Sequence, residues 1–331
     1  MPKPASRFTP EISDSNGEDP RCPSCGSDNF ETAFEALEPG FTVRKCVLCG
    51  LGRTWPQVPS SEIGKWYPET YYGKENVRFN PLFEVLTRLF RKRRASVVYT
   101  KAPKGKVLDV GCGRGLLLSY LRDLGYEAHG MEFSETAAWH ARNALGLDVE
   151  TGDFLNSKHE TDAYNAVILW HSLYHLIRPV EAVTRAHELL KPGGLLAIAV
   201  PNYGSLQARI FGRMWFHLDV PRHYWHFSVE SLEGVLKRHR FEIIKTDHFS
   251  FEQNPYGWVQ SIFNSLGFEP NFLYSLLKNP SAREHEIRSR PVQAVLTAVL
   301  FPIVLFFSLV LTLAETALRS GGTIEVYAIK R

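Results

Sequence analysis

Cysteine is scarce in this sequence, and neither sign of charge is in large excess. Five cysteines in 331 residues are too few for the dense disulfide framework of a small secreted domain. The 38 Lys and Arg face 35 Asp and Glu, which leaves a net charge of +3. So small a surplus does not call for a nucleic-acid partner. Internal repeats are absent, and the 44% hydrophobic and 22% charged composition excludes wholesale disorder, a collagen-like repeat and a coiled coil.

The first residues lack an apolar run. The start, Met1-Pro2-Lys3-Pro4, therefore predicts no export signal, and Pro2 excludes N-myristoylation. Residues 1–20 are rich in Pro, Ser, Glu, Asp and Gly and predict a flexible tail. We expect a cytoplasmic protein, and in such a reducing compartment paired cysteines indicate a metal site rather than disulfides.

Four of the five cysteines form two pairs, Cys22-Pro-Ser-Cys25 and Cys46-Val-Leu-Cys49, each followed by a glycine. A Cys-x-x-Cys turn points two thiolates at one ion, and two such turns supply the four ligands of a closed zinc site. Because no position is left open, we expect the zinc to be structural. The sequence predicts a zinc ribbon over residues 21–58 with a hairpin of Asn29–Phe34 and Phe41–Lys45. Chance spacing of reduced thiols is the alternative.

Short β-branched runs alternate with helical patterns from residue 106 to residue 200, which is typical of βαβ units on a parallel sheet. The predicted strands are Lys106–Val110, Glu127–Met131, Ala166–Leu169 and Leu195–Val200. The predicted helices lie near Leu116–Leu124, Glu135–Leu145 and Val180–Leu190. Ser134 and Gly146 are suitable caps for the second helix. Phe241–His248 and Thr323–Ala328 predict two last strands, so the predicted α/β core covers residues 106–250 plus 320–331.

A glycine loop, Gly111-Cys112-Gly113-Arg114-Gly115, follows the first of these strands, which carries Asp109. Such a loop lets a ligand approach the backbone, with helix N-terminal amides facing its charge. The third glycine of a dinucleotide fingerprint is missing. Glu132 ends the next strand, where a carboxylate can accept two ribose hydroxyls, and Gly152-Asp153-Phe154 would set an acid and an aromatic ring against an adenine. Another nucleotide-binding α/β domain is the alternative.

With these motifs the sequence resembles the class I S-adenosylmethionine-dependent methyltransferases, in particular the group whose zinc knuckles precede a Rossmann-like core. The resemblance covers about residues 20–250 plus the last strand, and includes Leu189–Gly194 and the segments Asp219–His223 and His226–Ser228. It implies a Rossmann-like sheet with helices on both faces behind a small zinc ribbon, and S-adenosylmethionine as cofactor. The resemblance places Asp109, Gly111 and Gly113 against the amino-acid part of this cofactor. It places Glu132 against the ribose, and Asp153 with Phe154 against the adenine.

Methyl transfer from a sulfonium is an in-line displacement, so most of the catalysis is positioning of the reactants. A hydroxyl acceptor also needs a base, and histidine is the usual choice near neutral pH. Histidines gather after the fourth and fifth strands, where open α/β sheets bind ligands. Our candidates are His223 first and His175 second, together with His171, His217, Asp219 and His226. For each single histidine, a structural hydrogen bond is the alternative.

Two departures from the family pattern bear on the substrate. Many relatives carry Glu-His after the fourth strand, where this sequence has Tyr174-His175, so the role of that glutamate is absent or moved. Enzymes that methylate exocyclic base amines carry an Asn/Asp-Pro-Pro-aromatic tetrad, where this sequence has Leu169-Trp170-His171-Ser172. This favours O-methylation over amine methylation of nucleobases.

A long uncharged run, Pro291–Ala314, lies between the last two predicted strands. As a continuous helix at ~1.5 Å per residue it could span a bilayer, but a single crossing would put the last strand on the wrong side. Pro302 near the middle would kink or break the helix. We therefore predict a re-entrant or interfacial hairpin within a hydrophobic insertion over residues 251–319. A buried hairpin or a dimer contact is the alternative.

A second stretch, Phe79–Arg94 in the predicted linker 59–105, combines a one-sided apolar face with Arg91-Lys92-Arg93-Arg94. Such a basic amphipathic helix is suited to anionic lipid headgroups. Packing on the core with a solvated basic end is the alternative.

The leading interpretation is a methyltransferase at the cytoplasmic face of a membrane that O-methylates a lipid, a lipid-linked sugar or an isoprenoid-like acceptor. A soluble small-molecule acceptor stays open. The second interpretation is an RNA methyltransferase that uses the zinc ribbon as an RNA grip, although the basic residues lack the interleaved aromatics of stacking platforms. The third is a non-catalytic cofactor-binding scaffold, because Tyr174 replaces the usual glutamate. The oligomeric state is not predicted.

Overall fold

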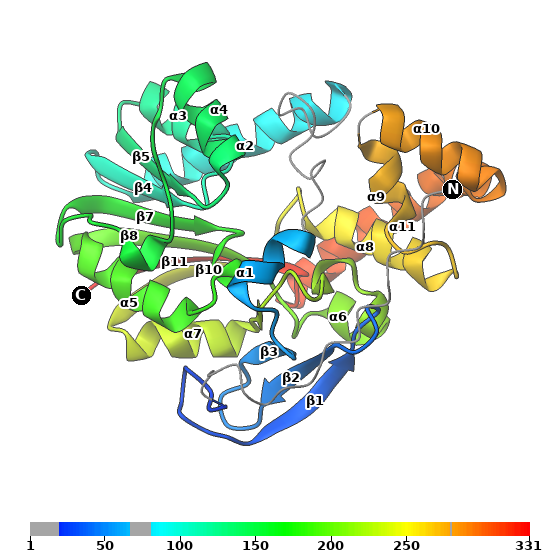
Figure 1. Cartoon of the computed structure of the whole chain (residues 1–331), viewed down its shortest axis with the longest axis horizontal. Coiled ribbons are helices and arrows are strands. Elements are labelled where there is room, and N and C mark those ends of the chain that lie inside the picture. Colours follow the sequence, from blue (N-terminus) through cyan, green and yellow to red (C-terminus); the bar gives the residue numbers. More distant parts are fainter. Residues whose placement is uncertain (1–19, 67–80, 279) are drawn as a thin grey trace.

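Two β-sheets form the framework of this computed structural model, which describes residues 20–66, 81–278 and 280–331 (Figure 1). The larger sheet has seven strands in the order β10-β11-β8-β7-β4-β5-β6. Strands β4 to β8 pair in parallel, whereas β11 is antiparallel to both of its neighbours, β8 and β10. The bounds are β4 (Lys106–Val110), β5 (Glu127–Glu132), β6 (Asp148–Thr151), β7 (Tyr164–Trp170), β8 (Leu190–Pro201), β10 (Phe241–Asp247) and β11 (Thr323–Lys330).

Helices cover both faces of this sheet. One face is covered by α2 (Pro81–Lys101), α3 (Leu116–Asp123) and α4 (Glu135–Leu145), and the other by α5 (Pro179–Leu189) and α7 (Val229–Arg238) (Figure 1). Along β7, Ile168 packs in the cluster that contains α2 and α3, and its neighbours Val167 and Leu169 pack in the cluster that contains α5 and α7. This alternation with period two is that of a strand buried on both sides. The predicted Rossmann-like α/β fold is confirmed.

Several predicted elements occur with their predicted bounds, namely Lys106–Val110 and Glu135–Leu145. At the ends of the latter, the Ser134 hydroxyl accepts the backbone N–H of Ala137 at 3.4 Å, and Gly146 adopts a left-handed φ of 60°. Both predicted caps are therefore confirmed. Strand β8 is longer than predicted at its start, and the structure adds β6 and α7, which the sequence patterns did not indicate. Of the predicted flexible tail, residues 1–19 lie outside the described residues.

The smaller sheet joins the cysteine-bearing segment to the core. Its strands β1 (Phe30–Glu35), β2 (Thr42–Cys46) and β3 (Gly52–Trp55) are antiparallel, and β9 (Trp225–His226) pairs with β3. The predicted hairpin corresponds to β1 and β2, whereas β3 and its pairing with a distant segment were not predicted. Gly52 is needed here, because a Cβ atom would lie 2.9 Å from that of His226.

Short helices connect these parts. They are α1 (Ser60–Ile63), η1 (Gly64–Trp66), η2 (Phe154–Asn156), η3 (Leu173–His175), α6 (Leu206–Phe211), η4 (Gly212–Met214) and η5 (Phe216–Leu218). Between β10 and β11 the chain forms a layer of longer helices beside the sheet (yellow to red in Figure 1). They are α8 (Asn254–Ser265), α9 (Phe272–Leu277), α10 (Pro280–Ser289) and α11 (Pro291–Ala317).

The predicted hairpin in the apolar run is wrong, because α11 is one continuous helix of 27 residues that passes through Pro302. A proline inside a helix removes one backbone hydrogen bond, and the turns on either side of it remain helical here. The carboxyl end of α11 is fixed to the core by Glu315, whose carboxylate accepts the Gln207 side-chain amide at 3.0 Å. Because β11 follows closely, the carboxyl end of the helix is held to the core.

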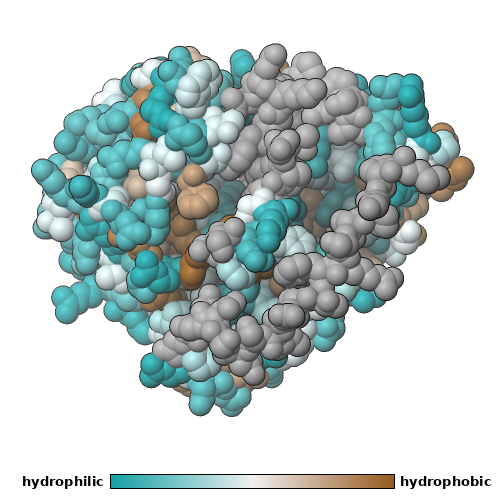
Figure 2. Space-filling view, viewed as in Figure 1, coloured by the Kyte–Doolittle hydropathy of each residue, from teal (hydrophilic) through white to brown (hydrophobic). Residues whose placement is uncertain are grey.

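One side of α11 packs on α8, and the other side is exposed. Leu300, Phe301, Val304 and Leu305 contact a buried cluster that contains Val259 and Phe263 of α8. The exposed side, which we call the outer face, is formed by Val292, Val295, Val299, Ile303, Phe306, Val310 and Leu313, all more than half exposed except Val310 at 50%. By contrast, the face of the molecule seen in Figure 2 is mainly hydrophilic where its residues are coloured.

Among the helices that the structure describes, α11 is the single one long and apolar enough to cross a membrane. This criterion concerns length and composition, and a core helix of a soluble protein can also meet it. Only 17% of the most apolar window of α11 is buried, however. The helix is therefore not a core helix of the described fold.

The prediction that residues 91–94 offer a basic surface to lipid headgroups is wrong for three of these four side chains. Arg91 and Arg94 pair with Glu252, and Arg93 Nη1 lies 2.9 Å from Glu325 Oε1. The arginines are thus engaged within the protein, because α2 packs against β11 and the segment before α8. Phe79, at the start of the predicted helix, lies outside the described residues.

Candidate active site

A cavity of about 1440 Å³ opens at the carboxyl ends of β4, β5 and β7 and extends to the inner side of α11. Drug-sized ligand pockets range from about 300 to about 1,000 Å³, so this cavity can hold two reactants. Of the residues that the sequence proposed for catalysis or for the cofactor, all except His226 lie on its wall: His171, His175, His217, Asp219 and His223, and Asp109, Gly111, Gly113, Glu132, Asp153 and Phe154. His226 is not part of this wall, and its Nε2 lies 3.0 Å from the Thr54 hydroxyl. The edge that the strand pattern indicated is therefore the edge where the proposed residues meet.

The glycine loop and Glu132 form one end of the cavity. The Glu132 carboxylate accepts the backbone N–H of Gly113 at 2.8 Å and that of Ser134 at 2.9 Å, one on each oxygen. Each carboxylate oxygen can accept more than one hydrogen bond, so both keep room for a ligand hydroxyl. Gly113 has a φ of 56°, and a Cβ atom there would meet no atom within 4 Å. The loop is thus open toward the cavity.

Asp109 is the most strongly perturbed acid at this end. Its side chain is 4% exposed, and this burial raises the pKa of Asp109 to about 7, with Arg94 opposing the shift and Glu132 adding to it. Burial likewise raises the pKa of Glu132. A buried carboxyl without full compensation gains by meeting a cation. This end of the cavity is therefore suited to a positively charged ligand.

Asp153 and Phe154 lie beside the glycine-loop end of the cavity. Both already contact other protein groups, which the sequence did not suggest. Asp153 caps η2, because its carboxylate accepts the backbone N–H of Leu155 at 3.2 Å and the Asn156 amide at 3.0 Å. Phe154 is 2% exposed and belongs to the main core cluster. Both residues line the cavity, but most of the Phe154 ring packs against protein.

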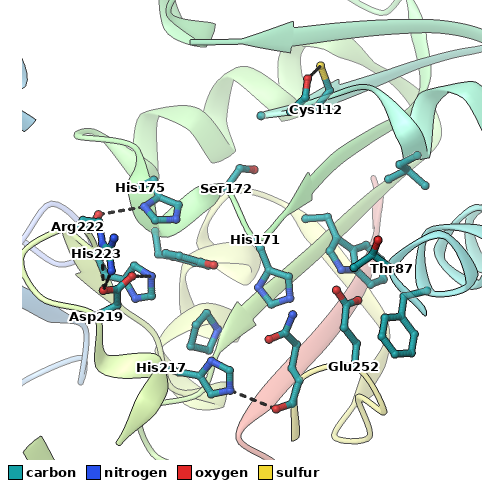
Figure 3. Close-up of a pocket in the computed structure, with 18 of the residues that line it drawn as sticks. Thr87, Cys112, His171, Ser172, His175, His217, Asp219, Arg222, His223 and Glu252 are labelled. Carbon is teal, nitrogen blue, oxygen red and sulfur yellow. Dashed lines mark hydrogen bonds and ion pairs between the residues drawn. The ribbon is translucent and has the colours of Figure 1, made fainter. Parts of the chain in front are cut away.

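A wall of aromatic and ionisable side chains closes the middle of the cavity (Figure 3). The His175 and His223 rings lie 4.9 Å apart, and each lies 4.4 Å from the Tyr174 ring. His175 Nδ1 donates to the Arg222 carbonyl at 3.0 Å, and His223 Nε2 lies 3.7 Å from an oxygen of Asp219. Burial lowers the pKa of both histidines, so both rings are neutral near pH 7.

His171 differs from these two histidines. It directly follows β7, has a φ of 58°, and its ring stands in the middle of Figure 3 without a hydrogen bond to the described residues. A non-glycine residue in this backbone region is uncommon and strained. The pKa of His171 lies well below its usual value because of burial and the charge of Arg94, which Glu252 partly offsets. The neighbouring Ser172 hydroxyl is buried without a partner among the described residues.

Sequence reasoning missed Glu252, which lies between β10 and α8. Its carboxylate pairs with Arg91 at 3.1 Å and with Arg94, and the Arg94 guanidinium also lies over the Trp170 ring. Burial would raise the pKa of Glu252, but the two arginines outweigh it and hold this pKa at about 2. Arg94 and Glu252 are hydrogen-bonded but lie 158 residues apart in the sequence. No local sequence pattern could have predicted this contact.

Each arginine side chain that lines the described part of this cavity has a carboxylate partner. Five arginines line it within the described part of the chain, and each forms an ion pair: Arg91 and Arg94 with Glu252, Arg114 with Glu84, Arg178 with Glu181 and Arg222 with Asp219. The described lining contains no lysine. Arg91 and Arg94 share Glu252, but the described lining also holds five Asp and Glu residues against its five arginines. It therefore carries no net positive formal charge for a phosphorylated ligand.

The two cysteine pairs lie together outside this cavity. The four Sγ atoms are within 4.8 Å of one another, with Cys22 and Cys49 at 3.5 Å and Cys25 and Cys46 at 3.5 Å. Both turns have the same geometry, since Gly26 and Gly50 adopt left-handed φ values of 76° and 73°. Four thiols converging in this way fit the donor set of a tetrahedral metal site.

An open α/β sheet with a glycine loop and buried acids at one cavity defines an enzyme that binds a nucleotide-like cofactor at its topological switch point. The family model described as a methyltransferase domain matches residues 77–246, half of the chain. This protein belongs to that family and is an S-adenosylmethionine-dependent methyltransferase. The acids at the glycine-loop end fit the sulfonium and ammonium charges of this cofactor.

Curated relatives share this domain. The chain is 27% identical over 172 residues to a ubiquinone biosynthesis O-methyltransferase of Cereibacter sphaeroides, a match that covers 47% of this chain and 67% of that protein. It is 30% identical over 154 residues to the protein of that name from Thiobacillus denitrificans, covering 44% of this chain and 64% of the relative. The match therefore leaves about half of this chain without a counterpart.

Solved structures of methyltransferases also align with this chain. A SAM-dependent methyltransferase from Archaeoglobus fulgidus aligns with a TM-score of 0.46 and 20% identity, over 73% of this chain and 94% of that one. A possible histamine N-methyltransferase from Thermotoga maritima aligns with a TM-score of 0.44 and 15% identity, over 76% of this chain and 96% of that one.

If Asp109 holds the ammonium of the cofactor, its raised pKa makes cofactor binding dependent on pH. Because its raised pKa is about 7, the carboxyl takes up a proton below that pH and loses its attraction for the cofactor ammonium. We expect the affinity for S-adenosylmethionine to fall as the pH drops below about 7. Asp109→Asn should bind roughly 10- to 100-fold more weakly above that pH, the loss of one charge-assisted hydrogen bond, and its affinity should no longer change with pH. Isothermal titration calorimetry measures both effects.

The exposed Asp123→Asn variant is the control and should bind like the wild type. A wild-type affinity that stays constant across this pH range, or an Asp109→Asn variant that retains it, would show that Asp109 does not hold the ammonium.

Proposed function

We propose that this enzyme transfers the methyl group of S-adenosylmethionine to a hydroxyl oxygen of a neutral, hydrophobic, isoprenoid-like acceptor at the cytoplasmic face of a membrane. One observation carries the proposal: a single cavity joins the cofactor end at the glycine loop to the apolar inner side of α11. An acceptor with a polar head and an apolar tail fits both parts at once. The relatives named as O-methyltransferases of ubiquinone biosynthesis support oxygen as the receiving atom.

The charge balance of the cavity argues for a neutral acceptor. A lipid-linked sugar carries a phosphate or diphosphate, whose binding generally relies on arginine or lysine. The described arginines of the cavity are each paired with a carboxylate, and bringing in a phosphate would break such pairs. An uncharged hydroxyl compound has no such cost.

His171 is proposed as the base. Bound S-adenosylmethionine supplies a methyl group on a sulfonium, and S-adenosylhomocysteine leaves as the methyl group moves to oxygen. The neutral His171 ring takes the proton of the acceptor hydroxyl as the carbon–oxygen bond forms. His171 follows β7, which pairs with β4, so it stands where the cofactor strand and the acceptor wall meet. His175 and His223, with Asp219, are proposed to position the acceptor, because one ring nitrogen of each histidine already faces a protein oxygen.

The outer face of α11 is proposed to lie in one leaflet of the membrane. A contiguous exposed apolar face marks an interaction site, and a helix that packs on α8 along its other side lies along the membrane surface rather than across it. With the arginines of α2 engaged internally, apolar contact rather than headgroup charge is the main source of membrane affinity.

The proposed function is tested with purified protein, methyl-labelled S-adenosylmethionine and a lysate of the source cells. After the reaction, the organic-soluble, RNA and aqueous small-molecule fractions are separated and counted. We expect label in the organic fraction, and none with Asp109→Asn at low cofactor concentration. Label in RNA without label in the organic fraction would overturn the proposal and support an RNA methyltransferase.

The role of His171 is tested by His171→Asn, since asparagine tolerates the left-handed backbone and cannot act as a base. We expect kcat for the organic-soluble product to fall about 10²- to 10⁴-fold, with the affinity for S-adenosylmethionine unchanged. With saturating cofactor, wild-type kcat should stay high below pH 6.5, because burial lowers the pKa of His171 and the base stays unprotonated there. His217→Gln, at a cavity histidine bonded to the Gln253 carbonyl, is the control; an equal loss in both variants would argue against His171.

We also propose that Cys22, Cys25, Cys46 and Cys49 hold one structural zinc ion. The purified protein should then contain about one zinc per chain, measured by elemental mass spectrometry. Cys46→Ser should lose most of the metal and unfold at a lower temperature. Cys112→Ser, which changes the one cysteine outside this cluster, should retain the zinc. Metal-free wild-type protein with unchanged thermal stability would contradict the proposal.

A further inference from the structure

The part of the cavity farthest from the glycine loop is almost entirely apolar. Its wall combines Val259 of α8 and Leu277 of α9 with Phe301, Leu305 and Leu309 of α11. Tyr256, Leu277, Phe301 and Leu305 pack on the same buried cluster as Val259, so these residues form one continuous wall. We call this region the apolar arm.

Aromatic rings connect the apolar arm to the histidine wall. Phe216 lies 5.1 Å from the Tyr256 ring and 5.8 Å from the Tyr274 ring, and it also contacts the ring of His217 at 5.0 Å. All four of these residues line the cavity. A molecule whose hydroxyl reaches His171 can therefore continue along these rings into the arm without leaving the cavity.

The arm reaches the surface beside the outer face of α11. Leu309 lines the cavity and is still 39% exposed, and Phe251, which packs on Phe90 of α2, lines the cavity and is 54% exposed. Side chains that belong both to a cavity wall and to the surface mark its opening. Because Leu309 is adjacent to Val310 of the outer face, this opening lies next to the surface proposed to contact lipid.

The two faces of α11 thus have different tasks. Phe301, Leu305 and Leu309 recur every four residues and line the cavity, whereas Ile303, Phe306 and Val310 recur every three to four residues and are exposed. This spacing places each set on its own side of one helix. A single helix therefore separates the cavity from the proposed lipid surface.

We propose that the apolar arm binds the hydrocarbon chain of the acceptor, which enters from the membrane beside Leu309 while its hydroxyl end reaches His171. This rests on the proposed function and specifies the part of the site that selects for a long apolar chain. The ligand class is a neutral isoprenoid alcohol or phenol, since the described lining of the cavity holds as many Asp and Glu as Arg residues and no Lys.

The test titrates geranylgeraniol, a neutral isoprenoid alcohol, into the full-length protein saturated with S-adenosylhomocysteine, followed by calorimetry. The variant Leu305→Trp places a larger side chain in the arm, and Phe306→Trp makes the same kind of change one residue along, on the outer face. We expect the wild type and Phe306→Trp to bind with similar affinity and Leu305→Trp at least about tenfold more weakly, because a few buried methylene contacts are lost. Geranylgeranyl diphosphate should bind more weakly than the alcohol.

Unchanged affinity for S-adenosylhomocysteine and an unchanged melting temperature show that Leu305→Trp is folded. Equal geranylgeraniol affinity in all three proteins, or no binding to the wild type, would overturn the assignment of the arm. Tighter binding of the diphosphate would overturn the neutral ligand class.

The lipid contact and the chain site are separated by a second pair of measurements. Ile303→Asp/Phe306→Asp, on the outer face, should lower sedimentation with phosphatidylcholine vesicles and leave geranylgeraniol affinity in solution unchanged. Leu305→Trp should show the opposite pattern. If Leu305→Trp still labels the organic fraction at the wild-type rate, methyl transfer to a hydrophobic acceptor stands and the arm is not its chain site.

Discussion

The position of β11 between β8 and β10 is the constraint on which the arrangement of this molecule depends. The chain leaves the sheet after β10, forms α8 to α11, and must return to fill the gap between two strands that are already far apart in sequence. Gly321 and Gly322 make this return, and Cβ atoms there would lie 2.0 Å from the His248 carbonyl oxygen and 2.7 Å from the Gln207 side chain. Around them, Asn202 donates to the Gly321 carbonyl at 3.0 Å. The apolar helix before this turn is consequently tied to the catalytic sheet and cannot move away from it as a separate anchor.

This tie also explains how the two halves of the cavity come together. The glycine loop and Glu132 are built by strands at the parallel side of the sheet, through local backbone geometry. The side that we propose for the acceptor is built by segments that come from the opposite side of the sheet: the loop at Glu252, α8 and α11. Arg94 of α2 joins the two, since it pairs with Glu252 and lies over Trp170 at the end of β7. The ion pair sits in a buried setting where breaking one partner leaves an uncompensated charge.

What the sequence could predict follows from how local each feature is. The strand Lys106–Val110, its glycine loop and the helix capped by Ser134 are specified by neighbouring residues, and they occur as expected. The Cys-x-x-Cys spacing of the two cysteine turns by itself predicts that the thiols of each pair point at one ion. The pairing of β3 with β9, some 170 residues later, was missed because no local pattern indicates it. Glu252 was missed because only the fold brings it to Arg94. The predicted hairpin is wrong because it places a helix end at Pro302. A proline removes a single hydrogen bond, and residues on both sides of Pro302 pack on the cluster that contains α8.

The pairing of β3 with β9 has a consequence for the protein as a whole. The Thr54 hydroxyl donates a hydrogen bond to the His223 carbonyl. The Thr54 backbone N–H donates to the Tyr224 carbonyl. The Tyr203 and Tyr224 hydroxyls return bonds to the carbonyls of Gly50 and Val58. The cysteine ribbon is therefore not a detachable module that could be trimmed for expression or exchanged between relatives. Its removal would leave β9 without its partner strand and the carbonyls of His223 and Tyr224 without the hydrogen bonds that Thr54 donates.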